Sequence, residues 1–169
     1  AIAYQLDWYP RPHGSVPPRL SFDTEGDEGR GPPGIVGERT VTTSVGSPVT
    51  LSVNARDISE RDPDDFRFWE GIPINMVWSK HQGPVGGEVE FARHESTPVE
   101  ESDDDDDDAP APNTIQVLES EGVAHVYATF SASGEYLLRV QADIFSAPDS
   151  GTQDQCCWTN GYVRVTVGP

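Results

Sequence analysis

The chain has 169 residues, with 29 Asp and Glu against 11 Lys and Arg, which gives a formal net charge of −18 at pH 7. Such a charge repels nucleic-acid phosphates and anionic membrane surfaces, so neither is a predicted partner. No apolar run approaches the roughly 18–20 residues of a transmembrane helix, and the length favours one domain with an appendage.

The first residue is Ala1, and no signal peptide is visible. Signal peptides are removed after small residues, so we interpret the chain as a mature exported protein that is extracellular, at the cell surface or periplasmic. A chain trimmed at its start is the alternative interpretation. The 15 Pro and 16 Gly agree with a loop-rich extracellular β-protein.

Residues 1–39 are predicted to form an extended N-terminal arm, because they are rich in proline and glycine. Proline fixes φ and lacks an N–H group, which excludes a helix or a central strand through this region. At the start of the arm, apolar side chains occupy every second position, at Ile2, Tyr4, Leu6 and Trp8. This alternation is a strand signal. Two partners remain open for such a strand: the chain's own domain and the sheet edge of a neighbouring molecule.

From residue 40 to residue 169 the pattern changes to short alternating runs separated by turns. Val49–Ala55 alternates apolar and polar residues as a half-buried strand does, and Trp78 in the run 74–79 suits a sandwich core. The other runs cover residues 41–45, 88–91, 114–118, 124–130, 135–142 and 161–167. About seven to eight short strands and no helical period predict an all-β fold, an antiparallel β-sandwich.

An acidic segment interrupts these runs at about residues 95–113. It contains the unbroken aspartate run Asp103–Asp108, followed by the sequence Ala-Pro-Ala-Pro. Adjacent carboxylates repel one another and cannot pack, so this segment is predicted to be a solvated loop of the disordered type.

Several of the predicted strands and turns carry a family resemblance. The segments are 44–51 (SVGSPVTL), 77–80 (VWSK), 130–136 (FSASGEY), 134–140 followed by Asp143, and 163–167 (VRVTV). Together they resemble PKD or related Ig-like extracellular modules over residues 40–167. The segment 155–160 (QCCWTN) is similar to one in uncharacterised exported bacterial proteins that carry this sandwich. The resemblance implies an Ig/PKD-like β-sandwich and is nearly silent on activity.

Cys156 and Cys157 are adjacent and are the two cysteines of the chain. In an oxidising compartment two cysteines are expected to pair, but neighbouring Cα atoms lie closer than most disulfides allow. A vicinal disulfide therefore needs a distorted or cis peptide bond; two thiols on opposite faces of a strand are the alternative. The pair is predicted to stiffen a corner, or to form an apolar platform beside Trp158 for a sugar or an aromatic ring.

Two acidic clusters are candidate calcium sites, because Ca²⁺ takes about six to eight oxygen ligands at about 2.4 Å. The first cluster is Asp57, Asp62, Asp64 and Asp65, and the second is Asp143, Asp149 and Asp154. Neither has EF-hand spacing, and solvated loop acids are the alternative interpretation.

Catalytic signatures are missing from the sequence. The four histidines are scattered without metal-ligand spacing, and no serine stands in a GxSxG motif. We therefore predict a protein that is not an enzyme. The leading hypothesis is an extracellular structural subunit of a filament or surface layer, which associates with itself or with another extracellular protein through the arm. The alternative is an accessory module that binds carbohydrate or a protein partner through aromatic residues such as Trp69 and Trp158.

Overall fold

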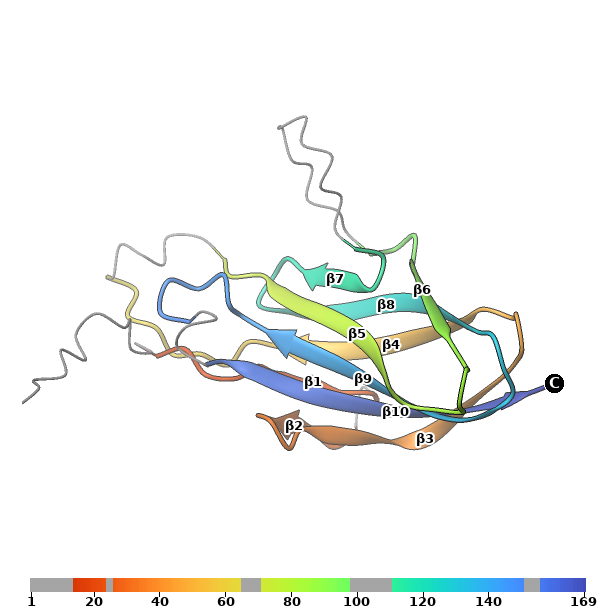
Figure 1. The fold of residues 1–169 in the computed structure, drawn as a ribbon. Helices are drawn as coiled ribbons and strands as arrows, with labels where there is room; N and C mark the ends of the chain where they lie inside the picture. The colour runs from red at the N-terminus through yellow and green to blue at the C-terminus, as the bar shows by residue number, and fades with distance from the viewer. Residues whose placement is uncertain (1–13, 24–25, 65–70, 98–110, 151–155) are drawn as a thin grey trace, which may run out of the picture.

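The computed structural model describes residues 14–23, 26–64, 71–97, 111–150 and 156–169, and it contains ten β-strands in two sheets packed face to face (Figure 1). Sheet one has the order β2 (Gly29–Arg30), β1 (Arg19–Ser21), β4 (Val49–Arg56), β8 (Glu121–Phe130) and β6 (Val89–Arg93). Sheet two has the order β3 (Ile35–Ser44), β10 (Trp158–Gly168), β9 (Gly134–Asp143), β5 (Ile74–Gln82) and β7 (Thr114–Val117).

The predicted all-β sandwich is confirmed. The strand pairs are antiparallel except for β3 and β10, which run parallel. The structure has ten strands where seven or eight were predicted, because two short strands, β1 and β2, lie in the proline-rich region. Their residues fall between the prolines, at Arg19–Ser21 and Gly29–Arg30, so no proline interrupts either ladder.

Alternation along the strands builds the core between the sheets. On β4 the residues Leu51, Val53 and Ala55 are buried, while Thr50 and Ser52 are exposed. Trp78 on β5 is fully buried and its ring centroid lies 6.5 Å from that of Phe91 on β6, as its core position in the sequence predicts. The inward-facing residues of β8 and β9 complete the core: Ala124, Val126, Ala128, Phe130, Tyr136, Leu138, Val140 and Ala142.

Part of the range predicted as an arm lies inside the sandwich. β1 and β2 fall within residues 1–39, β3 begins at Ile35, and Leu20 is fully buried in the core. Residues 1–13, at the start of that range, lie outside the described residues, as does most of the acidic segment (98–110). β1, β2 and the start of β3 are thus part of the sandwich rather than of an arm, and of the predicted arm (1–39) beside the sandwich (40–169) the stretch 1–13 stays a prediction.

The chain changes sheets between β2 and β3. It crosses the start of β10, where the Asn160 side chain donates a hydrogen bond to the Pro32 carbonyl oxygen (2.7 Å) and the Thr159 hydroxyl accepts one from the Gly31 N–H (2.9 Å). Gly34 has a φ of +62° and lies against the Asn160 carbonyl, where a side chain would not fit. These contacts bring β3 beside β10.

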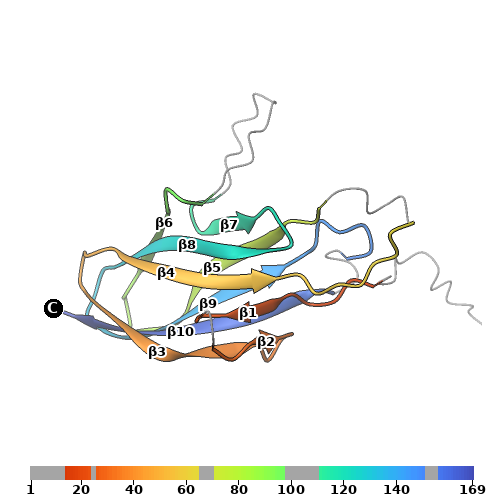
Figure 2. The same cartoon turned by 180° about the vertical axis from the view of Figure 1, so that it is seen from behind.

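The change of sheet leaves part of β4 uncovered. β1 pairs only with the last three residues of β4, Asn54–Arg56, and then turns away (Figure 2). The first part of β4, residues 49–53, pairs with β8 on one side and with no strand of the described chain on the other. The sandwich therefore has an open sheet edge between β3 and β4.

Candidate functional site

A groove follows the open edge of β4. It has a volume of about 190 Å³ and is lined by residues of β3, β4, β10 and the chain after β1: Phe22, Asp23, Gly37, Arg39, Val41, Thr50, Leu51, Ser52 and Val163. Apolar side chains form its floor, since Leu51 and Val163 belong to the core, with Phe22 and Val41 packed against it. The rim is polar. An apolar floor beside a free backbone edge is the combination that binds an extended peptide.

The backbone of β4 presents its free hydrogen-bonding groups to this groove. The Asp57 N–H donates to the Ser120 carbonyl oxygen at 2.6 Å, and Asp57 continues the register of β4 with β8. In an antiparallel ladder alternate residues bond to opposite sides, so odd-numbered residues of β4 bond to β8. Thr50 and Ser52 therefore turn their N–H and C=O groups toward the groove.

An ion pair lies across the groove. Arg39 on β3 lies 3.8 Å from the carboxylate of Asp23, which follows β1, and the Arg39 side chain is 85% exposed. Exposed pairs of this kind contribute little to stability, so separating Arg39 from Asp23 costs little.

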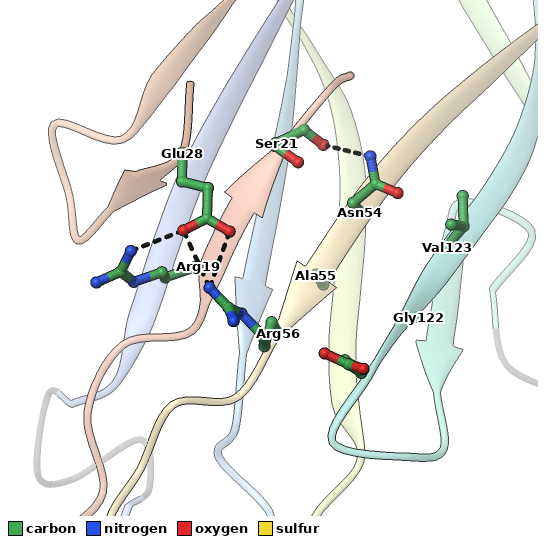
Figure 3. A pocket seen from close by; sticks show the side chains of 9 residues that line it. Arg19, Ser21, Glu28, Asn54, Ala55, Arg56, Gly122 and Val123 are labelled. Carbon is green, nitrogen blue, oxygen red and sulfur yellow. Dashed lines mark hydrogen bonds and ion pairs between the residues drawn. The ribbon is translucent and has the colours of Figure 1, made fainter. Parts of the chain in front are cut away.

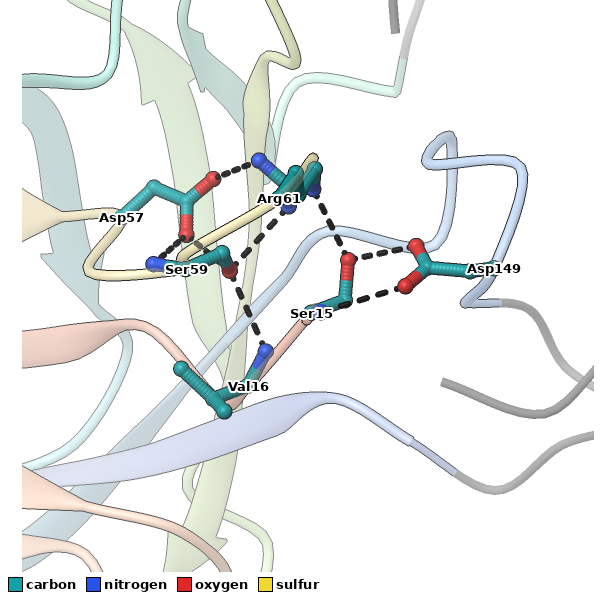
Figure 4. A network of polar contacts seen from close by, with 6 residues as sticks. All are labelled: Ser15, Val16, Asp57, Ser59, Arg61 and Asp149. Atoms are coloured by element: carbon teal, nitrogen blue, oxygen red, sulfur yellow. Dashed lines mark hydrogen bonds and ion pairs between the residues drawn. The ribbon is translucent and has the colours of Figure 1, made fainter. Parts of the chain in front are cut away.

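A polar network holds Ser15, near the start of the described chain, against two loops of the sandwich (Figure 4). The Ser15 N–H and hydroxyl donate to Asp149 at 3.1 and 2.5 Å, and Arg61 donates to the Ser15 hydroxyl at 2.9 Å and to Asp57 at 2.8 Å. Ser59 also donates to Asp57, through its N–H (2.9 Å) and its hydroxyl (2.5 Å). We call these five residues the anchor.

The anchor joins one aspartate from each predicted calcium cluster. Asp57 and Asp149 come together through Ser15 and Arg61, although the sequence placed them in separate clusters. Their carboxylates accept hydrogen bonds from this chain's own groups. Within the described part of the chain, no three His, Cys, Asp or Glu side chains are grouped to hold a metal ion.

The other members of the two clusters lie elsewhere. Asp62 accepts a hydrogen bond from the Asp64 N–H (2.9 Å) in an exposed turn, while Asp65 and Asp154 lie outside the described residues. Asp143 ends β9 on the opposite sheet from Asp57. Calcium binding therefore stays a prediction. Sequence analysis missed Ser15, Ser59 and Arg61, since each is a single polar residue without a motif.

Asp143 belongs to a row of polar and aromatic residues on sheet two. The register places Trp158, Asp143, Asn75 and Gln116 side by side on β10, β9, β5 and β7. Gln116 donates to Asn75 at 2.7 Å, and Asn75 donates to Asp143 at 3.4 Å. Burial raises the pKa of the Asp143 carboxyl, and the Phe145 N–H and the Asn75 and Gln141 side chains oppose this shift.

Cys156 and Cys157 are joined by a disulfide across a cis peptide bond just before β10. Cys157 is fully buried in the core, while Cys156 is partly buried against it. The half-buried Trp158 ring meets Phe145 edge-on, with centroids 6.4 Å apart. Of the platform predicted beside the cysteines, Cys156 and Trp158 are therefore partly exposed, while Cys157 is buried. Trp69, Ile2, Tyr4, Leu6 and Trp8 lie outside the described residues.

A larger cavity of about 430 Å³ lies on the outer face of sheet one, at the end of β4 (Figure 3). Its charged groups pair with each other: Glu28 accepts hydrogen bonds from Arg19 at 2.7 Å and from Arg56 at 3.1 Å. The hydrogen bond from Arg19, with the charge of Arg56, lowers the pKa of the Glu28 carboxyl. These hydrogen bonds hold β1 beside the end of β4, and the open edge begins where that pairing stops. We call Arg19, Glu28 and Arg56 the clamp.

Comparison with known proteins adds no family. No protein-family profile matches the sequence, and no curated protein matches it. Solved structures match weakly: domains 4 and 5 of the S-layer protein SbsC (13% identity, TM-score 0.39), the PapD-like domain 7 of human CEP192 (10%, 0.38) and a non-cellulosomal cohesin from Archaeoglobus fulgidus (14%, 0.33).

The alignments cover 78%, 99% and 75% of this chain, and 49%, 94% and 86% of the matched chains, in the same order. This chain thus spans about half of the S-layer structure. AvmM, which catalyses a macrocyclization, matches at a similar level (12% identity, TM-score 0.38, covering 94% of this chain and 92% of its own). Likenesses this weak assign no function. The resemblance to PKD and Ig-like modules holds for the two-sheet architecture and not for a sequence family.

Proposed function

We propose that the protein is a non-enzymatic extracellular assembly subunit that joins copies of itself by donating residues 2–8 as a β-strand. The observation that carries the proposal is the open edge of β4, where residues 49–53 lack a strand on one side within the described structure. Free edges are templates for pairing with another chain unless a protein covers them. The apolar-polar alternation of residues 2–8 suits a strand with one buried face.

Electrostatic repulsion between the acidic copies opposes this assembly. Each chain carries a formal charge of −18, so two copies repel each other at low ionic strength. Salt shortens the range of this repulsion to about 10 Å at 0.1 M. Assembly is therefore expected to strengthen as salt is added, and divalent cations at the acidic clusters would act in the same direction.

Ser52 and His125 resemble part of a catalytic triad, but their surroundings favour a non-enzymatic role. The Ser52 hydroxyl lies 2.8 Å from His125 Nδ1, but on an exposed face of sheet one. The His125 ring lies beside that of His94, with centroids 5.2 Å apart. A dyad in open solvent lacks the preorganised surroundings that catalysis needs.

An exported location fits the disulfide, because disulfides are typical of oxidising compartments such as the periplasm or the cell exterior. Among the described residues, no helix is long and apolar enough to cross a membrane.

The test measures oligomeric state by size-exclusion chromatography with light scattering, and particle shape by negative-stain microscopy, over a salt series with and without EDTA. We expect species larger than the 18.4 kDa chain, and a monomer for Leu6→Asp. Gln5→Asp is the matched control, since it adds the same charge on the opposite face of the strand. A wild-type monomer under all conditions would end the proposal. Dissociation in EDTA would support calcium at the joints.

A second candidate function is carbohydrate binding on the outer face of sheet two. It rests on Trp158, Asn75 and Gln116, which are half-buried in this row, because sugars are bound by an aromatic ring beside amide groups. Asp143 is only 5% exposed and accepts the hydrogen bond from Asn75. The test is binding of an oligosaccharide panel by calorimetry, with Gln116→Ala expected to weaken binding. Absence of heat across the panel would remove this candidate.

A further inference from the structure

We infer that the donated strand binds in trans, antiparallel to β4, in the groove between β3 and β4 of a second copy. This inference rests on the proposed function and adds the acceptor site, the direction of the strand and the resulting order of the copies.

The acceptor edge has a defined length and polarity. Thr50 and Ser52 turn their backbone groups to the groove, and the stretch 49–53 has room for about five paired residues of the incoming strand. The incoming strand continues the line of β1, which already lies antiparallel to β4 as far as Ser21. Apolar side chains at alternate positions of the donor then face Leu51 and Val163.

The same segment is less well placed to fill its own groove. To reach that groove from Gly14, the segment would have to fold back beside β1, which runs antiparallel to β4. It would then run parallel to β4, a pairing that is slightly weaker than the antiparallel one.

Pairing in trans orders the copies head to tail. The anchor lies at one end of the sandwich, and the turn from β3 to β4 lies at the other end, beside the C-terminus (Figure 1). An antiparallel donor leaves the groove at the β3–β4 end, so the anchor end of one copy meets the β3–β4 end of the next. Head-to-tail contacts form a closed ring only when the rotation between successive copies returns to the first copy. Otherwise they continue, and the product that we expect is a filament.

The test separates donor from acceptor with two substitutions. Leu6→Asp damages the donor and leaves the groove intact. Thr50→Pro removes one edge N–H and crowds the incoming strand, while the bonds of β4 to β8 remain, because Thr50 faces the groove. Thr50→Val is the matched control that keeps the N–H. We expect each damaged variant alone to be monomeric, and their mixture to form one-to-one dimers but no longer species.

A second measurement uses a labelled peptide of residues 1–9 and the full-length Leu6→Asp chain, followed by fluorescence anisotropy. Adding Thr50→Pro to that chain should weaken binding by about tenfold or more, and adding Thr50→Val by less than about threefold. Thermal unfolding of each variant shows whether it folds.

The outcomes distinguish the two proposals. If Thr50→Pro assembles to the wild-type extent while Leu6→Asp stays monomeric, the groove is not the acceptor site, but assembly through residues 2–8 stands. A wild-type chain that never assembles and a peptide that never binds overturn both.

Discussion

The two parts of β4 belong to one strand but lie in different surroundings. Asn54–Arg56 pair with β1 on one side and with β8 on the other, and Arg56 also bonds to Glu28, whereas residues 49–53 pair with β8 alone within the described part of the chain. The inward side chains of both parts are equally buried, since Leu51 is 2% and Ala55 is 3% exposed. The difference is therefore in the backbone. Among the described residues, strands on both sides satisfy the hydrogen bonds of one part, while the other part has a strand on one side only.

The largest effect is expected where the closed part meets the core. Leu20→Ala removes a fully buried side chain from β1 and should lower the free energy of unfolding by about 2–5 kcal/mol. Urea unfolding followed by tryptophan fluorescence measures this change. A loss under about 1 kcal/mol would mean that β1 is not packed as part of the core.

Proline substitution compares the two parts directly. Asn54→Pro removes an N–H that faces β1 and should cost about 1–3 kcal/mol, whereas Thr50→Pro removes one that faces the groove and should change stability by less than about 0.5 kcal/mol. Both are measured by urea unfolding of the monomer, in the Leu6→Asp background. Equal costs at the two positions would contradict an open edge at Thr50.

A smaller, pH-dependent effect is expected at the row on sheet two. Burial raises the folded-state pKa of Asp143 above its ordinary value, so the folded state holds this proton more tightly than the unfolded chain. Its contribution to stability is present at low pH and is lost as pH rises through the folded pKa. Asp143→Asn should therefore raise the melting temperature at pH 7 and lose that advantage toward pH 3. A variant less stable at pH 7 would show that the hydrogen bonds to the carboxylate outweigh its burial.

The smallest effect is expected at the clamp that limits the open edge. Glu28 has a lowered pKa, so its contribution is present above the unfolded pKa and is lost as pH falls through the folded value. Because the clamp is partly exposed, Glu28→Gln should cost less than about 1 kcal/mol. Hydrogen exchange of the β1 amides is the more sensitive measurement and should become faster. Unchanged exchange would mean that β1 is held by its ladder and Leu20 alone.

The alternating runs predicted most of the sandwich, because a strand with one buried face must place apolar residues at every second position. The runs holding Leu51, Trp78 and Val140 are all strands with these residues in the core. Prediction failed at β1 and β2, whose two or three residues are too few for a period. It also missed the anchor, because Ser15, Arg61 and Asp149 are far apart in the sequence and carry no motif.

Composition and local pattern by themselves determined the all-β class, the burial of Trp78 and the strong negative charge, since each depends on side chains and their spacing alone. Only the tertiary structure decided that the chain changes sheets between β2 and β3, and that Asp57 and Asp149 meet through Arg61 and Ser15. It also decided that the first part of β4 pairs with β8 alone within the described residues. The reason is that an open edge is a missing partner for backbone groups, and every residue has the same backbone groups whatever its side chain.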